Sequence, residues 1–205
     1  MKATLGRILV LAALLAAPAV QANTLPSDDA SPDGPVHVRF DPAMRETVVA
    51  SRVTPRLCFA LSLPEEWRQN TGSGETSITA VSSSAEIDIH LRSARELQDQ
   101  PQSDLAQRDA VFLQQDYETL LGRPAQSVSI TSPAPGATRW SATWIDQNLP
   151  AGSHAITIEA LIVPLSDEWV LELSLAGIDT PQSHEALVGT VLSGLKVRVG
   201  AACRD

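Results

Sequence analysis

CFALSLPEEWRQN, residues 58–70, begins with the alternation of a β-strand and then stops at a proline. The apolar positions of this strand share one face: Leu57, Phe59, Leu61 and Leu63. Such alternation is typical of a half-buried strand. Pro64 has no N–H to donate, so it ends the strand. The stretch therefore predicts a first core strand and a corner behind it, where Glu65, Glu66 and Trp67 follow.

These three corner residues have two interpretations. Trp67 can lie exposed beside two carboxylates and bind a cationic or sugar ligand, or it can fold back and close one end of the core. We favour the core position, because tryptophan is usually well buried. Glu65 and Glu66 are not predicted to be a catalytic pair, because adjacent residues on a turn point apart and nothing indicates separated pKa values.

The first 22 residues predict a secretory signal peptide. Lys2 and Arg7 precede a short apolar run, which Pro18 and the sequence Ala-Val-Gln-Ala follow. Cleavage is expected after Ala22. The apolar run is shorter than the roughly 20 residues that span a membrane, and no later segment is longer, so no membrane span is expected. Asn23 follows the cleavage site, which makes a lipid anchor at that position unexpected.

Composition predicts an acidic exported protein of one folded domain. The 205 residues carry a net charge of −9, which becomes −11 when Lys2 and Arg7 leave with the signal peptide. Such a charge repels phosphate backbones, so nucleic acid is not an expected partner. Residues 23–50 predict a flexible acidic leader, with a short helix or an edge strand starting near its end. Residues 51–205 have the length of a single domain.

Cys58 and Cys203 are the two cysteines of the chain. An even count in an oxidising compartment predicts one disulfide between them. The alternative is a reactive thiol pair, which we do not favour. The spacing is not C-x-x-C, and no basic group or helix start lies beside Cys58 to lower the pKa of its thiol.

The remaining chain alternates between strand and helix patterns. Residues 75–83 and 85–93 predict the two strands of a hairpin. An amphipathic helix with one apolar face is predicted next, with Ser103 as its N-cap and Gly122 at its end. That face consists of Ala106, Ala110, Leu113, Tyr117 and Leu120. Four strands are predicted next, at residues 125–131, 138–146, 154–165 and 168–178, and their short connections favour an antiparallel meander.

A second helix is expected after Thr180, with Pro181 in its first turn and Leu187, Val191 and Leu195 on one face. The order strand, hairpin, helix, strands, helix predicts an α+β fold, with an antiparallel β-sheet flanked by helices in an α/β/α sandwich.

The chain resembles the PsbP-like superfamily in its motif and in its order of elements. The likeness rests on the segment FALSLPEEW (59–67), the hairpin, the long helix, the meander and the closing helix in LVGTVLSGLKV (187–197). This superfamily includes the extrinsic PsbP proteins of photosystem II, a Ran-binding nuclear import factor and many small exported bacterial proteins. In its members, an aromatic strand followed by Leu-Pro or Tyr-Pro and then Trp forms the first strand and its corner. The likeness covers residues 56–199 and implies a fold more than a function, because members of one fold differ widely in activity.

Asp88 and His90 form the strongest candidate metal pair. They alternate with Ile87 and Ile89, so both are predicted on the strand face away from the core, where i and i+2 ligands can share zinc, copper or manganese. Two ligands are too few for a site, and no H-x-x-x-H or H-E-x-x-H spacing adds a third. A solvated polar face is therefore the favoured interpretation, and no cofactor is predicted.

Trp140, Trp144 and Trp169 lie on predicted strands, where they can line a binding cleft or form the core. Strand periodicity favours the core. No G-x-S-x-G or phosphate-loop pattern is present in the sequence. We therefore expect a periplasmic or secreted accessory or binding protein without catalytic activity, which acts on a protein partner in the envelope of a Gram-negative bacterium. The alternatives are a hydrolase-like enzyme whose site no motif reveals and a metal-binding protein. The oligomeric state stays open.

Overall fold

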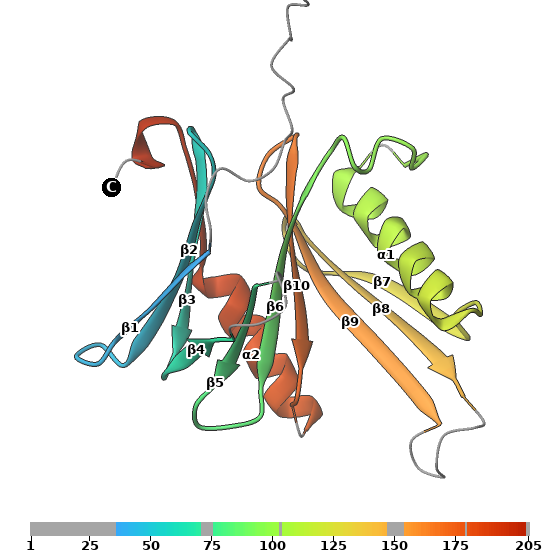
Figure 1. Ribbon diagram of the computed structural model, residues 1–205, viewed down its shortest axis with the longest axis horizontal. Coiled ribbons are helices and arrows are strands. Elements are labelled where there is room, and N and C mark those ends of the chain that lie inside the picture. Colours follow the sequence, from blue (N-terminus) through green and yellow to red (C-terminus); the bar gives the residue numbers. More distant parts are fainter. Residues whose placement is uncertain (1–35, 71–75, 103, 147–153, 179, 204–205) are drawn as a thin grey trace, which may run out of the picture. The chain divides into compact units, whose positions relative to one another are not determined.

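The strands of this chain form two antiparallel sheets (Figure 1). A computed structural model describes residues 36–70, 76–102, 104–146, 154–178 and 180–203. The four-stranded sheet has the order β1-β2-β3-β11 and consists of β1 (His37–Asp41), β2 (Glu46–Thr54), β3 (Leu57–Pro64) and β11 (Leu195–Val199). The seven-stranded sheet has the order β4-β5-β6-β10-β9-β8-β7 and consists of β4 (Trp67–Gln69), β5 (Thr76–Ala80), β6 (Glu86–Ser93), β7 (Ser127–Ala134), β8 (Ala137–Ile145), β9 (Ala155–Pro164) and β10 (Trp169–Ala176).

The predicted α+β class is confirmed, but the single sheet is replaced by two. The division occurs at the end of β3. Pro64 ends that strand, Glu65 has a left-handed backbone with φ of 68°, and Trp67 already pairs with Ala80 in the other sheet. The pattern of apolar residues locates each strand, but it does not say in which sheet a strand is paired. The change of sheet at this corner could therefore not be predicted.

The helix α1 (Leu105–Leu121) packs on β8, β9 and β10 of the seven-stranded sheet, and α2 (Pro181–Gly194) packs on β3 of the four-stranded sheet. The core under α1 contains Ala110, Trp140, Trp144 and Ile162. Tyr117 of α1 stacks on Trp140, with 6.0 Å between the ring centroids. The predicted order of elements is confirmed. It consists of the hairpin of β5 and β6, then α1, the meander from β7 to β10, and α2.

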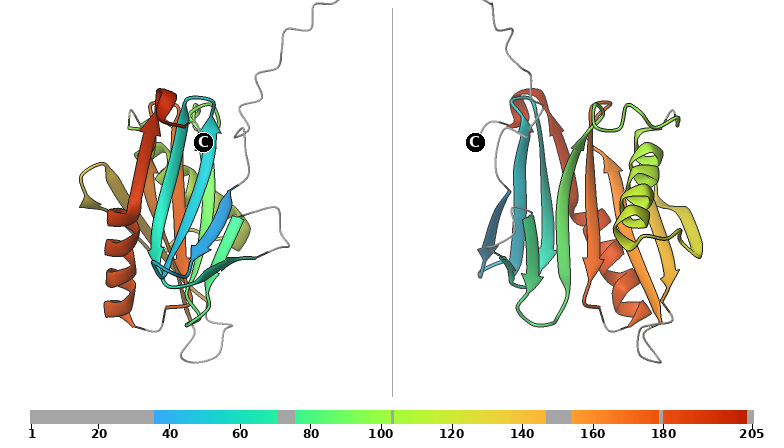
Figure 2. Two further views of the ribbon diagram at one scale, coloured as in Figure 1. Left: turned by 90° about the vertical axis from the view of Figure 1, so that its left-hand side faces the viewer. Right: turned by 45° about the vertical axis from the view of Figure 1, so that its right-hand side comes forward.

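The helix α2 also makes polar contacts with side chains of the seven-stranded sheet that point away from α1. Arg139 of β8 bonds Glu185 of α2, and His184 of α2 contacts Glu159 of β9. The two views of Figure 2 show α2 beside the four-stranded sheet, away from α1. Gly194 brings the end of α2 so close to β3 that a Cβ atom at this position would overlap the carbonyl oxygen of Ser62.

The folded part of the chain begins earlier than the sequence predicts. β1 and most of β2 fall within residues 37–50, which were assigned to the flexible leader. β2 is a strand rather than a helix, and it is not an edge strand, because it pairs with both β1 and β3. β1 contains only Val38 and Phe40 as apolar residues, so its pairing with β2 decides its conformation rather than its own pattern. The predicted signal peptide and residues 23–35 lie outside the described residues.

The helices differ from the predictions at their ends. Asp104 caps α1 by accepting the N–H of Gln107 at 3.0 Å, whereas the predicted cap, Ser103, lies outside the described residues. Leu120, predicted on the core face, is 76% exposed, because Leu121, four residues after Tyr117, packs on the core instead.

In α2, the buried residues are Val188 and Val191. Leu195, which the sequence placed on this helix, belongs to β11. Within the described ranges, neither helix has the length and apolar content that crossing a membrane requires.

The predicted disulfide between Cys58 and Cys203 is confirmed, with 5.7 Å between the Cα atoms. Cys58 lies in β3, opposite Arg198 of β11, and Cys203 ends the 3-10 turn η1 (Gly200–Cys203) that follows β11. Arg52 of β2 adds a hydrogen bond of 3.0 Å to the carbonyl oxygen of Cys203. The bridge therefore fixes the edge strand β11 to the centre of its sheet.

Replacing both cysteines with alanine (C58A/C203A) is expected to lower the free energy of unfolding by about 2–4 kcal/mol, because the bridge restricts the unfolded chain over a separation of 145 residues. Urea denaturation of the variant and the wild-type protein measures the difference. An unchanged midpoint at an unchanged m-value would contradict the assigned role of the bridge.

Candidate functional site

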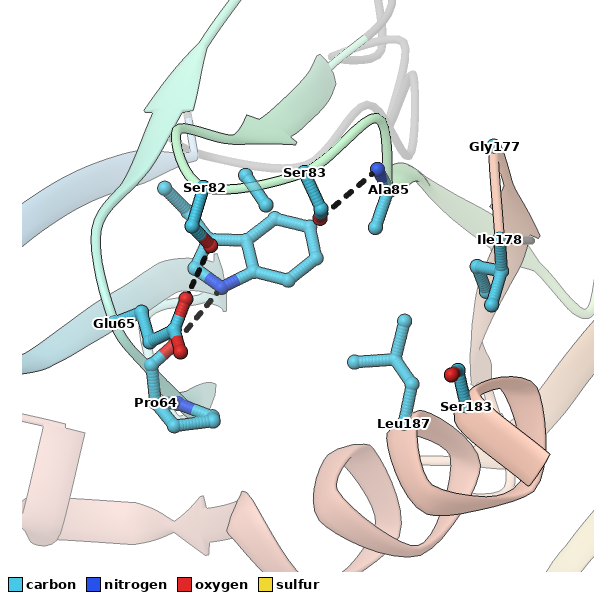
Figure 3. A pocket seen from close by; sticks show the side chains of 11 residues that line it. Pro64, Glu65, Ser82, Ser83, Ala85, Gly177, Ile178, Ser183 and Leu187 are labelled. Atoms are coloured by element: carbon cyan, nitrogen blue, oxygen red, sulfur yellow. Dashed lines mark hydrogen bonds between the residues drawn. The ribbon is translucent and has the colours of Figure 1, made fainter. Parts of the chain in front are cut away.

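A pocket of about 320 Å³ lies at the corner where the chain passes from β3 to β4. We call it the corner pocket; it lies between this corner, the turn from β5 to β6, the end of β10 and the first turns of α2 (Figure 3). Its lining consists of Pro64, Glu65, Trp67, Ala80, Ser82, Ser83, Ala85, Gly177, Ile178, Ser183 and Leu187. The corner motif of the sequence thus forms one wall of a concave site.

Trp67 belongs to the floor of the pocket rather than to an exposed surface. It is 5% exposed, and its indole Nε1 donates a hydrogen bond of 3.0 Å to the carbonyl oxygen of Pro64. Its backbone N–H donates to the Thr47 hydroxyl at 3.0 Å. The favoured interpretation, in which this tryptophan closes the corner, agrees with its position.

Glu65 is held in an unfavourable backbone conformation at the rim of the pocket. Its φ of 68° is rare for a residue with a Cβ atom. The backbone N–H of Glu65 donates to the carbonyl oxygen of Arg45 at 2.9 Å, and its own carbonyl oxygen accepts from the hydroxyl of Thr47 at 2.8 Å. Arg45 has a left-handed backbone as well, with φ of 52°. Strained residues often occur at functional sites, where the surroundings hold them in place.

The serine turn, residues Ser82–Ser84, contributes Ser82 and Ser83 to the lining of the pocket, on the same side as Glu65 (Figure 3). The Ser82 hydroxyl donates a hydrogen bond to the Glu65 carboxylate, which joins the serine turn to the corner. The Ser84 hydroxyl donates to the carbonyl oxygen of Gly177 at 2.6 Å. Gly177 approaches this turn so closely that a Cβ atom would overlap the Ser84 carbonyl oxygen. The sequence suggested only a hairpin turn here, because the contact with Gly177 joins residues 93 positions apart.

A second pocket of about 290 Å³ adjoins the corner pocket on the other side of Glu65. Its lining consists of Phe40, Arg45, Glu65, Glu66, Val81 and Ser82. Glu65 and Ser82 line both pockets, so their hydrogen bond forms the wall between them. Glu66 lines only this second pocket, where its carboxylate faces Arg68 with 2.8 Å between the charged atoms.

The described lining of the corner pocket combines one carboxylate with hydroxyl groups and apolar surface. Among the described residues that line it, Glu65 is the one ionisable side chain. General acid/base or nucleophilic catalysis needs a second titratable group within hydrogen-bond reach of the first. A carboxylate above apolar walls can instead hold a ligand that carries a donor or a positive charge.

The other predicted site residues lie elsewhere. Trp140 and Trp144 are fully buried under α1, and Trp169 is 5% exposed on the opposite face of the same sheet, so these side chains form core rather than a binding surface. Asp88 and His90 share the predicted face of β6 and are half-buried, opposite Ser174 and Glu172. In the part of the chain that the structure describes, no three His, Cys, Asp or Glu side chains are placed to hold a metal ion.

A buried ion cluster joins α1 to the seven-stranded sheet. Arg92 of β6 binds Asp109 of α1 at 2.6 Å and Glu172 of β10 at 2.8 Å, and its guanidinium lies 4.3 Å from the centre of the Phe112 ring. Asp109 is 0% exposed, and its Oδ2 atom has no hydrogen-bond partner among the described residues. Burial, together with repulsion by Glu172, raises the pKa of Asp109 to about 7 against the attraction of Arg92.

The residues of this cluster are not among those that line the two pockets described above. The carboxylates of Asp109 and Glu172 share the single guanidinium of Arg92, so its one positive charge only partly neutralises their two negative charges. The sequence gives no sign of it, since the three charged residues come from three different elements.

No family model matches this chain, and no curated protein matches it.

Replacing Glu65 with glycine or with alanine tests the backbone strain. Both variants lose the carboxylate, but only glycine adopts a positive φ without a steric penalty. We expect E65G to be more stable than E65A by about 1 kcal/mol in urea denaturation. Equal stabilities would contradict strain at this position.

Asp109→Asn tests the buried ion cluster through pH. Because the pKa of Asp109 in the folded state is about 7, above its ordinary value of 3.8, the wild-type protein is stabilised by protonation. This stabilisation is complete below about pH 4 and is lost as the pH rises to about 7. Relative to the wild-type protein, D109N should therefore gain stability over this range, by up to about 4 kcal/mol at about 1.4 kcal/mol per pKa unit. The control is D116N, which removes a carboxylate from the exposed side of the same helix, outside the ion cluster.

Proposed function

We propose that this protein is an exported, non-catalytic binding protein of the cell envelope, and that the corner pocket receives a side chain of a protein partner. The observation that carries this proposal is the position of Glu65: a strained residue, fixed by two backbone hydrogen bonds, at the rim of a pocket. Strain of about 1–3 kcal/mol persists only where the surroundings enforce it, and a binding role explains why such a residue is kept.

The shape and lining of the pocket support a protein partner. Its volume of about 320 Å³ lies at the lower end of the range for small-ligand sites, and it accommodates one large side chain or a short segment. Trp67, Ile178 and Leu187 offer apolar surface for the stem of such a side chain, while Glu65 offers an acceptor at the rim. Burial of an aliphatic stem beneath a charged end is a common arrangement for lysine and arginine.

Charge supports the same proposal. The chain has a net charge of −9, or −11 without the predicted signal peptide. An acidic surface attracts basic partners at long range and speeds their association. Export through the predicted signal peptide fits a chain whose two cysteines form a disulfide, because disulfides persist in oxidising compartments. We also propose a place in the PsbP-like superfamily, which the order of strands and helices supports.

Two neighbouring residues of α2 provide a matched test. Leu187 lines the corner pocket, whereas Ala186 is exposed outside it. Leu187→Arg fills the pocket with a positive charge, and Ala186→Arg adds the same charge to the adjacent surface. Wild-type protein and both variants serve as baits for mild crosslinking in envelope extracts, with quantitative mass spectrometry of the captured proteins.

We expect a reproducible partner on the wild-type and A186R baits, and a yield at least about tenfold lower on L187R, which corresponds to a loss of about 1.4 kcal/mol or more. Circular dichroism first establishes that both variants fold. Recovery of no common partner, or equal recovery by L187R, would count against the proposal.

A further inference from the structure

One edge of the seven-stranded sheet is unlike the other three sheet edges among the described residues. Natural edge strands are kept from pairing with other chains by shortness or by charged side chains. β1 carries Arg39 and Asp41, β11 carries Lys196 and Arg198, and β4 has only three residues. β7, with the sequence SVSITSPA, has eight residues and no charge.

The outward backbone groups of β7 belong to its even-numbered residues. Asp146, directly after β8, donates its backbone N–H to the carbonyl oxygen of His154. The backbone N–H and C=O groups of even-numbered residues in β8 therefore point toward β9, and those of odd-numbered residues point toward β7. Ser129 of β7 is opposite Ser141 of β8, so the odd-numbered residues of β7 pair with β8. Val128 and Ile130 therefore direct their N–H and C=O groups away from the sheet.

The side chains of β7 repeat symmetrically about Ser129. Val128 and Ile130 flank it on the face that carries Trp140 and are 41% and 49% exposed. Ser127 and Thr131 lie two residues away on either side, with hydroxyl groups on the opposite face. Read in either direction, the segment is hydroxyl, β-branched, hydroxyl, β-branched, hydroxyl. Such a strand is complementary to an antiparallel copy of itself.

We propose that β7 pairs with β7 of a second copy of this chain, antiparallel, about a two-fold axis through Ser129. In this register, Val128 lies opposite Ile130 of the second copy, and their outward N–H and C=O groups exchange hydrogen bonds. β-Branched pairs across strands stabilise a sheet. Ser127 lies opposite Thr131 of the second copy, so hydroxyl groups also meet hydroxyl groups.

The charge of the strand selects a second copy over another partner. The chain is strongly acidic, yet residues 127–134 carry no charge, so two copies meet there without like charges in contact. A charged strand from a different protein would find no opposite charge on β7. The register shift between Thr131 and Ala134, together with Pro133, which has no N–H, limits the pairing to the first five residues.

Single cysteine substitutions test the register directly. Ser129 faces Ser129 of the second copy in a non-hydrogen-bonded pair, where Cα atoms lie about 4.5 Å apart, within the range that a disulfide spans. Two Ser127 residues lie four positions apart along the strands, about 13 Å, which no disulfide spans. With oxidised glutathione, the two thiols introduced by S129C lose their protons and two electrons to form the bridge, and the oxidant becomes two molecules of glutathione.

We expect S129C to form a covalent dimer on non-reducing gels, several-fold more than S127C. Sedimentation velocity of the wild-type protein should show a fraction of dimer that increases with protein concentration. The variant Ile130→Pro removes only an outward N–H group from the strand. It should be monomeric, with an unchanged circular dichroism spectrum. A wild-type protein that is monomeric at every concentration, or equal crosslinking of S129C and S127C, would overturn the proposal. A dimer that I130P leaves intact would also overturn it.

Discussion

The corner at Pro64 and Glu65 determines how the rest of this molecule is arranged. A proline ends the pairing of β3, a left-handed glutamate turns the chain, and Trp67 begins pairing in a different sheet. Hydrogen bonds from Glu65 to Arg45 and from Thr47 to Glu65 connect this corner to the hairpin of β1 and β2. If the chain continued straight after Pro64, β4 would not reach β5 and the wall of the corner pocket would be lost. The fold and the proposed binding site thus depend on one turn of the chain.

The two faces of the seven-stranded sheet are packed by different kinds of side chain. Under α1, aromatic packing dominates, with Tyr117, Trp140 and Trp144 in mutual contact and the Arg92 cluster at its border. The other face carries buried aliphatic side chains, among them Leu161, Leu171 and Leu173. Beside α2, Arg139 bonds Glu159 and Glu185 at a partly exposed position. These ion pairs are partly exposed to solvent and therefore contribute less to stability than the buried side chains on either face. The corner pocket lies beside the first turns of α2.

The sequence predicts those parts of the structure that depend on local patterns. Alternation located β3, β6 and β10, capping and proline signals located both helices, and an even cysteine count predicted the disulfide. Features that depend on contacts between distant residues were not predictable. The passage from one sheet to the other, the pairing of β3 with β11, and the contact of Ser84 with Gly177 each require the folded chain.

The candidate site illustrates the same limit. Trp67 and Glu65 were singled out as a corner, but their pocket also needs Ser82, Gly177 and Leu187, which come from three other places in the sequence. Each of these residues is unremarkable by itself. The charged triad of Arg92, Asp109 and Glu172 was missed for the same reason, since no spacing relates its members.

The pairing of β3 with β11 has a consequence for the order of events when the chain folds. β3 is complete by Pro64, but its partner on one side consists of residues 195–199, and Cys58 pairs with a cysteine 145 positions later. A chain that emerges N-terminus first therefore holds one edge of β3 open until almost the whole sequence has appeared. Contacts at such long separation slow folding and leave strand edges exposed in the meantime. The four-stranded sheet is thus the part of this protein that is finished last, although its first strands are the earliest to be made.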